Sequence, residues 1–367
     1  MVAGQKNQAR NSGMNNVVDF NGTTAVRDRY RFDEAGLAQW MQDHVEEFHG
    51  PLTVEQFKGG QSNPTYKLLT PNKNYVLRRK PPGLLVKGAH AVDREAKVLQ
   101  ALGKADFPVA HVYGLCTDDA VIGTWFYIME CVEGRIIWDV TFPDANNDER
   151  PRYFAAMNET LARLHCIDYL SIGLEDYGRP GNYFERQIAR WSKQYQGDPE
   201  AGCDPNLDRL IEWLPTHIPA GDETTITHGD FRVDNLVFHP TEPKVIAVLD
   251  WELSTLGHPL ADFSYHLMMY RMPPLVIAGL LGADLAALHI PTEAEYVADY
   301  CRRTGRDAIQ HLDFYVAFNM FRLAAIFHGI KGRQLRGTAA SANAKDMVTG
   351  LPLLAAEAWR QALKADA

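Results

Sequence analysis

The chain has 367 residues, of which 46% are hydrophobic and 23% charged, and its formal net charge is −9 at pH 7. These proportions are typical of a globular enzyme, and a chain of this length is long enough to form two lobes with separate cores. The acidic balance excludes the basic surface that nucleic-acid binding needs, so we expect no nucleic-acid partner.

The cysteines are spread along the chain without the paired CxxC spacing of zinc sites and disulfide frameworks: Cys116, Cys131, Cys166, Cys203 and Cys301. This pattern is typical of reduced thiols, so we expect a cytoplasmic protein. Residues 1–29 are rich in polar residues and lack the apolar core of a signal peptide. We expect this segment to be disordered.

Residues 30–132 are predicted to form a small lobe. Asp33 is a candidate N-cap for an amphipathic helix over residues 33–48, and a second helix is predicted over residues 89–103. Short alternating or β-branched runs between Gly, Pro and Asn turns are predicted strands: 52–60, 65–70, 74–80, 109–115 and 124–131. Strands and helices in this order predict a compact α+β unit, with a hinge to the next lobe near residues 130–134.

Residues 135–367 are predicted to form a larger, mainly helical lobe, with clear helical periodicity over 151–168 and 313–330. Within this lobe the apolar runs Leu236–Phe238 and Val245–Leu249 flank a turn that contains two prolines. We predict a β-hairpin there.

The most apolar stretch of the chain is Pro273–Pro291. It has nearly the length of a membrane span, but it contains Asp284 and His289 and has prolines at its ends. We therefore expect a buried helical segment and no membrane insertion.

Polar residues bracket the predicted hairpin in a pattern with chemical meaning. Asp230 and Asn235 precede its first strand with four residues between them, and Asp250 follows its second strand. Mg²⁺ prefers such oxygen ligands together with phosphate oxygens of a substrate. A carboxylate that does not bind the metal can instead accept the proton of an attacking hydroxyl group.

The sequence His228-Gly229-Asp230, followed by four residues and Asn235, resembles the signature of the aminoglycoside phosphotransferase family, whose fold is protein-kinase-like. The resemblance continues with Asp250 in VLDWE and with residues 257–265 (GHPLADFSY), and it covers roughly residues 30–340. It implies a bilobal α+β fold, Asp230 as catalytic base, and Asn235 and Asp250 as metal ligands.

Alternative interpretations exist for this segment. Asp230 and Asp234 are also residues that favour turns, and Asn235 also suits a hairpin cap, although this reading does not explain the order of the motifs. His228 is a candidate general base because its ordinary pKa lies near neutrality. The resemblance instead implies that His228 and Asp262 support the loop structurally.

A nucleotide site is expected in the small lobe. Gly59, Gly60, Gln61, Ser62 and Asn63 lie between two predicted strands, where glycines allow the backbone to approach phosphate closely. The segment differs from the glycine-rich loop of protein kinases. A plain hairpin turn is the alternative.

Arg78 and Glu95 match the strand lysine and helix glutamate of kinases in order and spacing. Arginine replaces the expected lysine but keeps the charge and can bind phosphate or carboxylate with two N–H groups. We expect Arg78 to pair with Glu95 and to reach the nucleotide phosphates. In the alternative reading, Arg78 and Arg79 are ordinary strand residues, one on each face.

Residues 126–135 (FYIMECVEGR) resemble a kinase hinge, in which Glu130 to Val132 offer backbone groups to adenine. The expected apolar contacts of the base are Val76, Val237 and Leu249, although all three also suit plain core positions. The resemblance implies ATP as the nucleotide.

The resemblance implies an ATP- and Mg²⁺-dependent kinase of a small molecule. A kinase-like binding module without turnover is the alternative, and a metal-dependent phosphohydrolase built on His228, Asp230 and Asp250 is a third class. Several segments look most similar to the kinase-like domain fused to some acyl-CoA dehydrogenases, which implies a hydroxyacyl acceptor as one candidate.

Three cations follow the long apolar helix predicted over 313–330: Lys331, Arg333 and Arg336. They suit a helix C-terminus, where the last carbonyls carry partial negative charge. If they face the cleft between the lobes, we expect them to bind an anionic acceptor.

Overall fold

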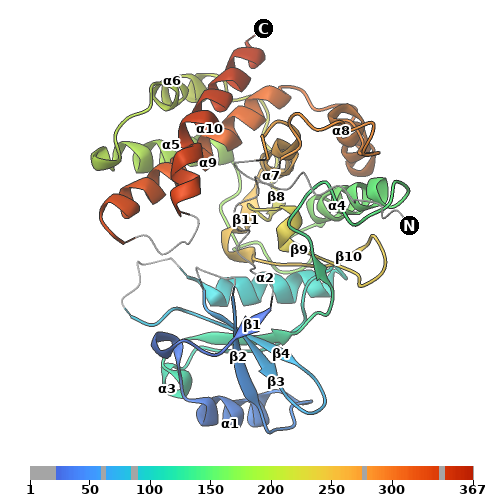
Figure 1. The fold of residues 1–367 in the computed structure, drawn as a ribbon, viewed down its shortest axis with the longest axis vertical. Coiled ribbons are helices and arrows are strands. Elements are labelled where there is room, and N and C mark those ends of the chain that lie inside the picture. The colour runs from blue at the N-terminus through green and yellow to red at the C-terminus, as the bar shows by residue number, and fades with distance from the viewer. Residues whose placement is uncertain (1–21, 59–62, 84–89, 275–278, 339–343, 367) are drawn as a thin grey trace, which may run out of the picture.

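The computed structural model describes residues 22–58, 63–83, 90–274, 279–338 and 344–366. These residues form two lobes, one built on a β-sheet and one mainly helical (Figure 1). The predicted two-lobed α+β architecture is confirmed.

An antiparallel sheet of six strands forms the small lobe, in the order β1-β2-β3-β4-β6-β5. The strands are β1 (Thr23–Thr24), β2 (Thr53–Phe57), β3 (Thr65–Leu69), β4 (Tyr75–Arg79), β5 (Val112–Cys116) and β6 (Phe126–Glu130). Each predicted strand is present within a few residues of its expected bounds. Because β1 pairs with β2, ordered structure begins before the predicted boundary at residue 30. Residues 1–21 lie outside the described part of the chain.

Helices pack against both faces of this sheet. They are α1 (Glu34–His44), α2 (Val92–Lys104) and the short α3 (Asp119–Ile122). The predicted N-cap is confirmed, since the Asp33 side chain accepts a hydrogen bond from the backbone N–H of Gly36 at 2.9 Å. Side chains alternate along each strand, so Leu77 joins the core around α1 while its neighbour Arg78 points to the α2 side.

Arg79 lies on the α1 side of β4 and is only 2% exposed. Its guanidinium donates to the Tyr66 hydroxyl at 3.2 Å and to the carbonyls of Tyr30 at 3.1 Å and Ile122 at 3.4 Å. The Phe32 ring lies 4.9 Å from its Cζ. Arg78 and Arg79 therefore lie on opposite faces of one strand, and Arg79 is a structural residue of the small-lobe core.

Two small sheets support the active-site loops of the large lobe. One has the order β10-β9-β7 and the other pairs β11 with β8. The strands are β7 (Arg135–Ile136), β8 (Thr225–Thr227), β9 (Leu236–Phe238), β10 (Val245–Val248) and β11 (Thr255–Gly257). The predicted hairpin is β9–β10. It places the loop that contains Asp230 before β9 and Asp250 after β10.

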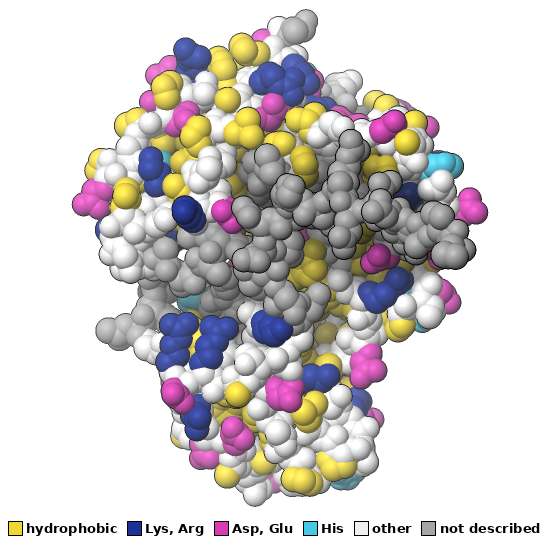
Figure 2. Space-filling view, viewed as in Figure 1, with side chains coloured by type: hydrophobic (Ala, Val, Ile, Leu, Met, Phe, Trp, Pro, Cys, Tyr) yellow, Lys and Arg dark blue, Asp and Glu magenta, His cyan; other side chains and the backbone are white. Residues whose placement is uncertain are grey.

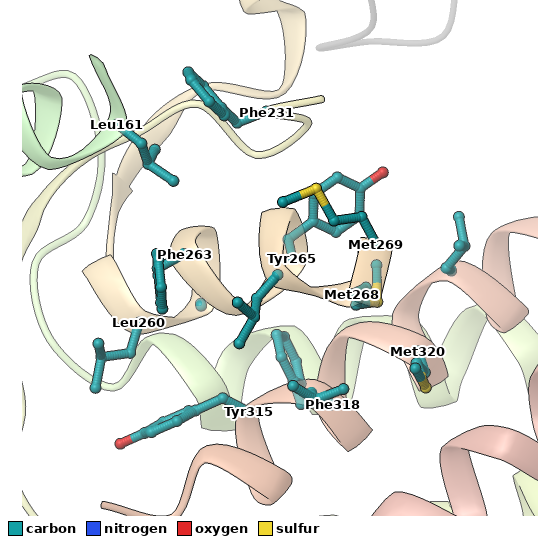
Figure 3. Close-up of a cluster of buried hydrophobic side chains, with 14 of the residues drawn as sticks. Leu161, Phe231, Leu260, Phe263, Tyr265, Met268, Met269, Tyr315, Phe318 and Met320 are labelled. Atoms are coloured by element: carbon teal, nitrogen blue, oxygen red, sulfur yellow. The ribbon is translucent and has the colours of Figure 1, made fainter. Parts of the chain in front are cut away.

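The large lobe is otherwise helical. Its helices are α4 (Arg150–His165), α5 (Tyr183–Gln196), α6 (Pro205–Trp213), α7 (Pro259–Leu267), α8 (Glu293–Thr304), α9 (Leu312–Leu335) and α10 (Ala344–Ala365). Short 3-10 helices are η1 (Asp28–Tyr30), η2 (Pro199–Ala201), η3 (Leu214–Thr216), η4 (Val233–Asn235), η5 (Trp251–Leu253) and η6 (Met268–Tyr270). Helix α9 is buried along most of its length, and its side chains pack with those of α7 in the lobe's core (Figure 3).

The prediction of a buried helical segment over Pro273–Pro291 is wrong. The described residues of this stretch form turns and are largely exposed; Leu281, for example, is 46% exposed. Gly282, with φ of 88°, and His289, with φ of 54°, have left-handed backbones that a regular α-helix does not contain. Among the described helices, none combines the length and the apolar character that crossing a membrane requires.

Acidic and basic side chains are interspersed over the described surface of the large lobe in the view of Figure 2. Such a mixture spreads the net charge of −9 instead of concentrating charge of one sign.

Acid should destabilise this fold through His258, the N-cap of α7. Its Nδ1 accepts a hydrogen bond from the backbone N–H of Leu260 at 3.1 Å, and burial lowers the pKa of His258 to about 4 from an ordinary value of 6.5. Between pH 6.5 and about pH 4, His258 is protonated in the unfolded chain and neutral in the folded chain. This difference removes about 2 kcal/mol of stability by pH 5.

His258→Asn keeps an N-cap acceptor without titrating, so the variant should lose about 2 kcal/mol less than the parent chain between pH 7.5 and pH 5. Urea unfolding at both pH values measures this difference. Equal losses in the two proteins would contradict the assignment.

Candidate active site

The catalytic loop follows β8 and is held by Asp262 in the first turn of α7. Asp262 is only 2% exposed. Its carboxylate accepts hydrogen bonds from the backbone N–H groups of His228 at 2.6 Å and Gly229 at 2.8 Å. Gly229 has φ of 84°, and a Cβ there would lie 2.8 Å from the Leu253 carbonyl oxygen. Only glycine fits this position without strain.

His165 holds Asp262 from the opposite side. Its Nε2 lies 3.2 Å from Asp262 Oδ2, and its Nδ1 lies 2.6 Å from the Tyr300 hydroxyl. Burial alone would raise the pKa of Asp262. The hydrogen bond and the charge interaction with His165, together with the His228 ring and backbone N–H, instead lower that pKa below its ordinary value. Asp262 therefore stays ionised as the anchor of the loop.

Both ring nitrogens of His228 are engaged with backbone groups. Its Nε2 donates to the Leu249 carbonyl at 2.8 Å, and its Nδ1 accepts from the N–H of Asp230 at 3.2 Å. The ring is fully buried. This geometry favours the structural role of His228 over a role as general base, and it ties the Asp230 loop to the end of β10.

Three side chains surround the Asp230 carboxylate. The Tyr265 hydroxyl donates to Oδ1 at 2.5 Å, and Arg232 Nε lies 3.2 Å from the same oxygen. Asn235 Nδ2 donates to Oδ2 at 3.2 Å and to the Asp230 backbone carbonyl at 2.9 Å. The contact with Arg232 Nε is an ion pair without a hydrogen bond, so only Tyr265 and Asn235 occupy acceptor positions of the carboxylate. A carboxylate has about four acceptor positions, and it can therefore still accept an incoming hydroxyl group. The Asp230 side chain is 20% exposed and thus accessible.

Arg232 is also fixed by Asp234, whose Oδ2 lies 2.9 Å from Nη2. Burial raises the pKa of Asp234, and Arg232 opposes that effect. Burial would lower the pKa of Arg232, but the carboxylates of Asp230 and Asp234 raise it instead. The loop therefore carries a permanent cation beside its candidate base.

Arg78 joins the two lobes. Its Nε lies 2.6 Å from Glu95 Oε2, its Nη2 donates to Asp250 Oδ1 at 2.7 Å, and Nη2 lies 3.5 Å from Glu252 Oε2. The predicted pair with Glu95 is present; the contact with Asp250 is an addition that sequence reasoning missed. Burial alone would lower the pKa of Arg78, but Glu95 and Asp250 raise it, so the group stays charged.

Glu95 is held by further small-lobe residues. Asn63 Nδ2 donates to its Oε1 at 2.7 Å, and the Tyr127 hydroxyl donates to its Oε2 at 3.2 Å. Asn63 is fully buried, so its side chain belongs to this network. The other candidates of the same segment, Gly59, Gly60, Gln61 and Ser62, lie outside the described residues.

Asp250 has a left-handed backbone, with φ of 63° and ψ of 63°. Such a conformation is costly for a residue other than glycine and is concentrated at functional sites. The Asp250 side chain is 37% exposed, so one carboxylate edge remains accessible beside Arg78. Asn235, which donates its Nδ2 to Asp230, presents an amide oxygen as a further hard ligand.

The predicted apolar contacts of a nucleotide base lie at the lobe border. Val76 is 7% and Val237 4% exposed, and Leu249 is half-buried. The N–H of Glu130 donates to the His111 carbonyl at 2.8 Å, so it is used within the small lobe. Val132 follows in the irregular segment between β6 and β7.

The three cations predicted to bind the acceptor lie at the end of α9. Arg336 forms ion pairs with Asp198 at 2.8 Å and Glu200 at 3.2 Å, which offset its charge. Lys331 is half-buried and Arg333 is exposed.

Residues 53–314 match the model of a family described as "Phosphotransferase enzyme family", and the match spans most of the chain. The chain belongs to this family. The description of the family names phosphotransferase activity, which makes the chain a member of an enzyme family.

The phosphotransferase also resembles part of several larger proteins. It is 43% identical over 317 residues to mouse acyl-CoA dehydrogenase family member 10, covering 86% of this chain and 30% of that protein. It is 43% identical over 340 residues to the probable acyl-CoA dehydrogenase IBR3 of Arabidopsis thaliana, covering 87% and 41%. The chain therefore spans less than half the length of these relatives.

A crystal structure from Ralstonia eutropha JMP134, provisionally named an aminoglycoside phosphotransferase, is 52% identical with a TM-score of 0.84, covering 91% of this chain and 99% of that one. A ternary complex of aminoglycoside phosphotransferase APH(4)-Ia with ADP and hygromycin B is 13% identical with a TM-score of 0.59, covering 90% and 98%. The first likeness supports the family, and the second shows the shared protein-kinase-like fold.

Asp262→Asn tests the anchor of the phosphotransferase loop. The amide keeps one acceptor oxygen but turns an NH₂ group toward an N–H or His165, so about 2–4 kcal/mol of stability should be lost. Urea unfolding measures the loss.

The control is Asp176→Asn, which removes an exposed ion pair with Lys97 and should leave stability nearly unchanged. If the two variants were equally stable, Asp262 would not anchor the loop.

Proposed function

We propose that this phosphotransferase transfers the γ-phosphoryl group of ATP, with Mg²⁺, to a hydroxyl group of a small anionic alcohol, of which a hydroxyacyl compound is the leading candidate. The observation that carries the proposal is the Asp230 carboxylate, which is accessible, is held by hydrogen bonds from Tyr265 and Asn235 and by the charge of Arg232, and keeps acceptor capacity for a hydroxyl group. A binding module without turnover has no need of such a group.

In the proposed reaction the acceptor hydroxyl attacks the γ-phosphorus of ATP. The new P–O bond forms as the bond to the bridging oxygen of ADP breaks, and the hydroxyl proton passes to Asp230. Tyr265 and Asn235 fix the carboxylate so that it faces the acceptor. Arg232, 3.2 Å from Asp230, keeps positive potential near the transferred group.

The residues present fit a magnesium site. Asn235 directly precedes β9 and Asp250 follows β10, so both lie at the open end of the β9–β10 hairpin. Both would supply hard oxygen ligands, and phosphate oxygens would complete the set. Within the described residues, no three His, Cys, Asp or Glu side chains gather closely enough to hold a metal alone. When bound, Mg²⁺ would neutralise charge on the β- and γ-phosphates.

Arg78 is proposed to bind the α- and β-phosphates. Its guanidinium group contacts both Glu95 and Asp250, so it lies between the small lobe and the carboxylate proposed to bind the metal. Glu95 would keep it in place when phosphate replaces part of the contact with Asp250. Gly59, Gly60 and Ser62 are proposed to cover the phosphates, and Val76, Val237, Leu249 and the Glu130–Val132 segment to hold the base.

The acceptor class is proposed on two grounds. The curated relatives carry the matched region within proteins named acyl-CoA dehydrogenases, which favours an acyl compound. Lys331 and Arg333 at the end of α9 add positive charge on the lobe expected to bind the acceptor, while Arg336 is offset by Asp198 and Glu200. An aminoglycoside, which is polycationic, would gain nothing from these cations.

Asp230→Asn should reduce phosphoryl transfer by roughly 10²–10⁴-fold, because the amide cannot accept the acceptor's proton. Its affinity for Mg-ATP should stay within a few-fold of the parent value. Asp250→Asn should weaken Mg-ATP binding instead, since it removes a metal ligand. Calorimetric titration with Mg-AMP-PNP separates these effects; equal affinities in the two variants would overturn the assigned roles.

Arg78→Ala should lower ATP affinity by about 1.5–3 kcal/mol, the range of a charge-assisted hydrogen bond. The matched control is Lys97→Ala on the neighbouring helix, which removes only an exposed ion pair with Asp176. Unchanged ATP affinity and turnover in Arg78→Ala would leave this strand without a part in the reaction.

A further inference from the structure

Arg322 of α9 is a buried cation without a carboxylate partner in the described part of the chain. The residue is 6% exposed, and its Nη2 donates to the Gly229 carbonyl at 2.7 Å. That bond uses one of the five N–H groups of the guanidinium. Every other buried or half-buried arginine of the active site, Arg78 and Arg232, forms an ion pair.

Aromatic rings surround this guanidinium. Its Cζ lies 5.3 Å from the centre of the Tyr265 ring and 5.9 Å from that of Trp191 on α5. Three helices, α5, α7 and α9, thus deliver residues to one place beneath the catalytic loop. In Figure 3, Tyr265 lies at the border of the buried cluster, with its hydroxyl oxygen directed away from the packed side chains of α9.

An unpaired guanidinium is an expensive group to bury, because it loses its hydration and gains little from a carbonyl and ring faces alone. The aromatic rings compensate part of this cost. An anionic ligand would supply the missing partner, and its carboxylate would match the planar fork of Arg322.

We propose that Arg322, between Trp191 and Tyr265, forms an anion subsite that binds a carboxylate of the acceptor next to the hydroxyl group that is phosphorylated. This proposal rests on the proposed function and narrows its acceptor to a hydroxy acid. Tyr265 connects the two ends of the site, because its ring faces Arg322 while its hydroxyl donates to Asp230 at 2.5 Å.

The subsite is distinct from the cations at the end of α9. Arg333 follows Arg322 by eleven positions, which is about 16 Å along a helix axis. A short hydroxy acid that contacts Asp230 and Arg322 does not reach that far. A coenzyme A thioester lacks the free carboxylate but is long enough for its phosphates to reach Arg333, so the two acceptor types depend on different arginines.

The first test measures turnover. In Arg322→Gln, the KM for 3-hydroxybutyrate should rise at least about tenfold, the effect of losing a charge-assisted hydrogen bond, with KM for ATP unchanged. The KM for 1,3-butanediol, which lacks the carboxylate, should stay within about twofold. Arg322→Lys should recover part of the loss. Arg302→Gln, which makes the same replacement at an exposed arginine paired with Asp299, should leave the KM for 3-hydroxybutyrate unaffected and is the matched control.

A different pattern would overturn the subsite. If Arg322 only holds the Gly229 carbonyl, Arg322→Gln will lower kcat for the acid and the diol alike. If the anion is provided by a coenzyme A thioester, Arg333→Glu will raise the KM for 3-hydroxybutyryl-CoA and Arg322→Gln will not affect either acceptor selectively.

The second test needs no turnover. Titrating the nucleotide-free protein with 3-hydroxybutyrate at constant ionic strength should give a saturable change in tryptophan fluorescence, lost in Arg322→Gln and in Trp191→Phe. A protein that binds the acid this way yet phosphorylates nothing would disprove the proposed function and keep the subsite. The subsite alone would be disproved by a protein that transfers phosphate but whose fluorescence titration is the same in the parent and in Arg322→Gln. A protein that transfers phosphate but shows no titration in either form would disprove it as well.

Discussion

The geometry of the active site depends on one buried carboxylate. Asp262 accepts the N–H groups of two successive loop residues, His228 and Gly229, and is itself held by His165. Asp230, the candidate base, follows immediately, so the bonds of the two preceding residues to Asp262 help to set its position. Because Asp262 lies in the first turn of α7, which also carries Tyr265, one helix fixes both the backbone and the side chain of the candidate base.

The second constraint links the lobes. Arg78 comes from a strand of the small lobe and contacts Asp250, 172 residues further along the chain. This single contact joins β4 of the small lobe to the residue that follows β10 of the large lobe. The backbone of Asp250 is left-handed at the end of the hairpin, and its carboxylate contacts Arg78 of β4.

The sequence predicts most of the fold and the core of the site, since their signals are local. The motif around Asp230 and Asn235 spans a few residues, and the hairpin that carries Asp250 shows as two apolar runs. His165, Tyr265, Arg232 and Arg322 were beyond such reasoning, because each acquires its role from a distant helix or loop. The turns of Pro273–Pro291 were mistaken for a helix because apolar composition alone does not reveal that Gly and Pro break the backbone pattern.

The pair Arg78 and Arg79 has a consequence for natural sequence variation. The two codons are adjacent and the residues are chemically identical, yet Arg78 faces the reaction and Arg79 is enclosed by Tyr66, Tyr30 and Phe32. With the role proposed for Arg78, a missense allele at position 78 would leave a normal amount of inactive protein, whereas one at position 79 would reduce the amount of protein in the cell. Abundance and activity measured together in one organism would therefore tell which of two neighbouring arginines had changed.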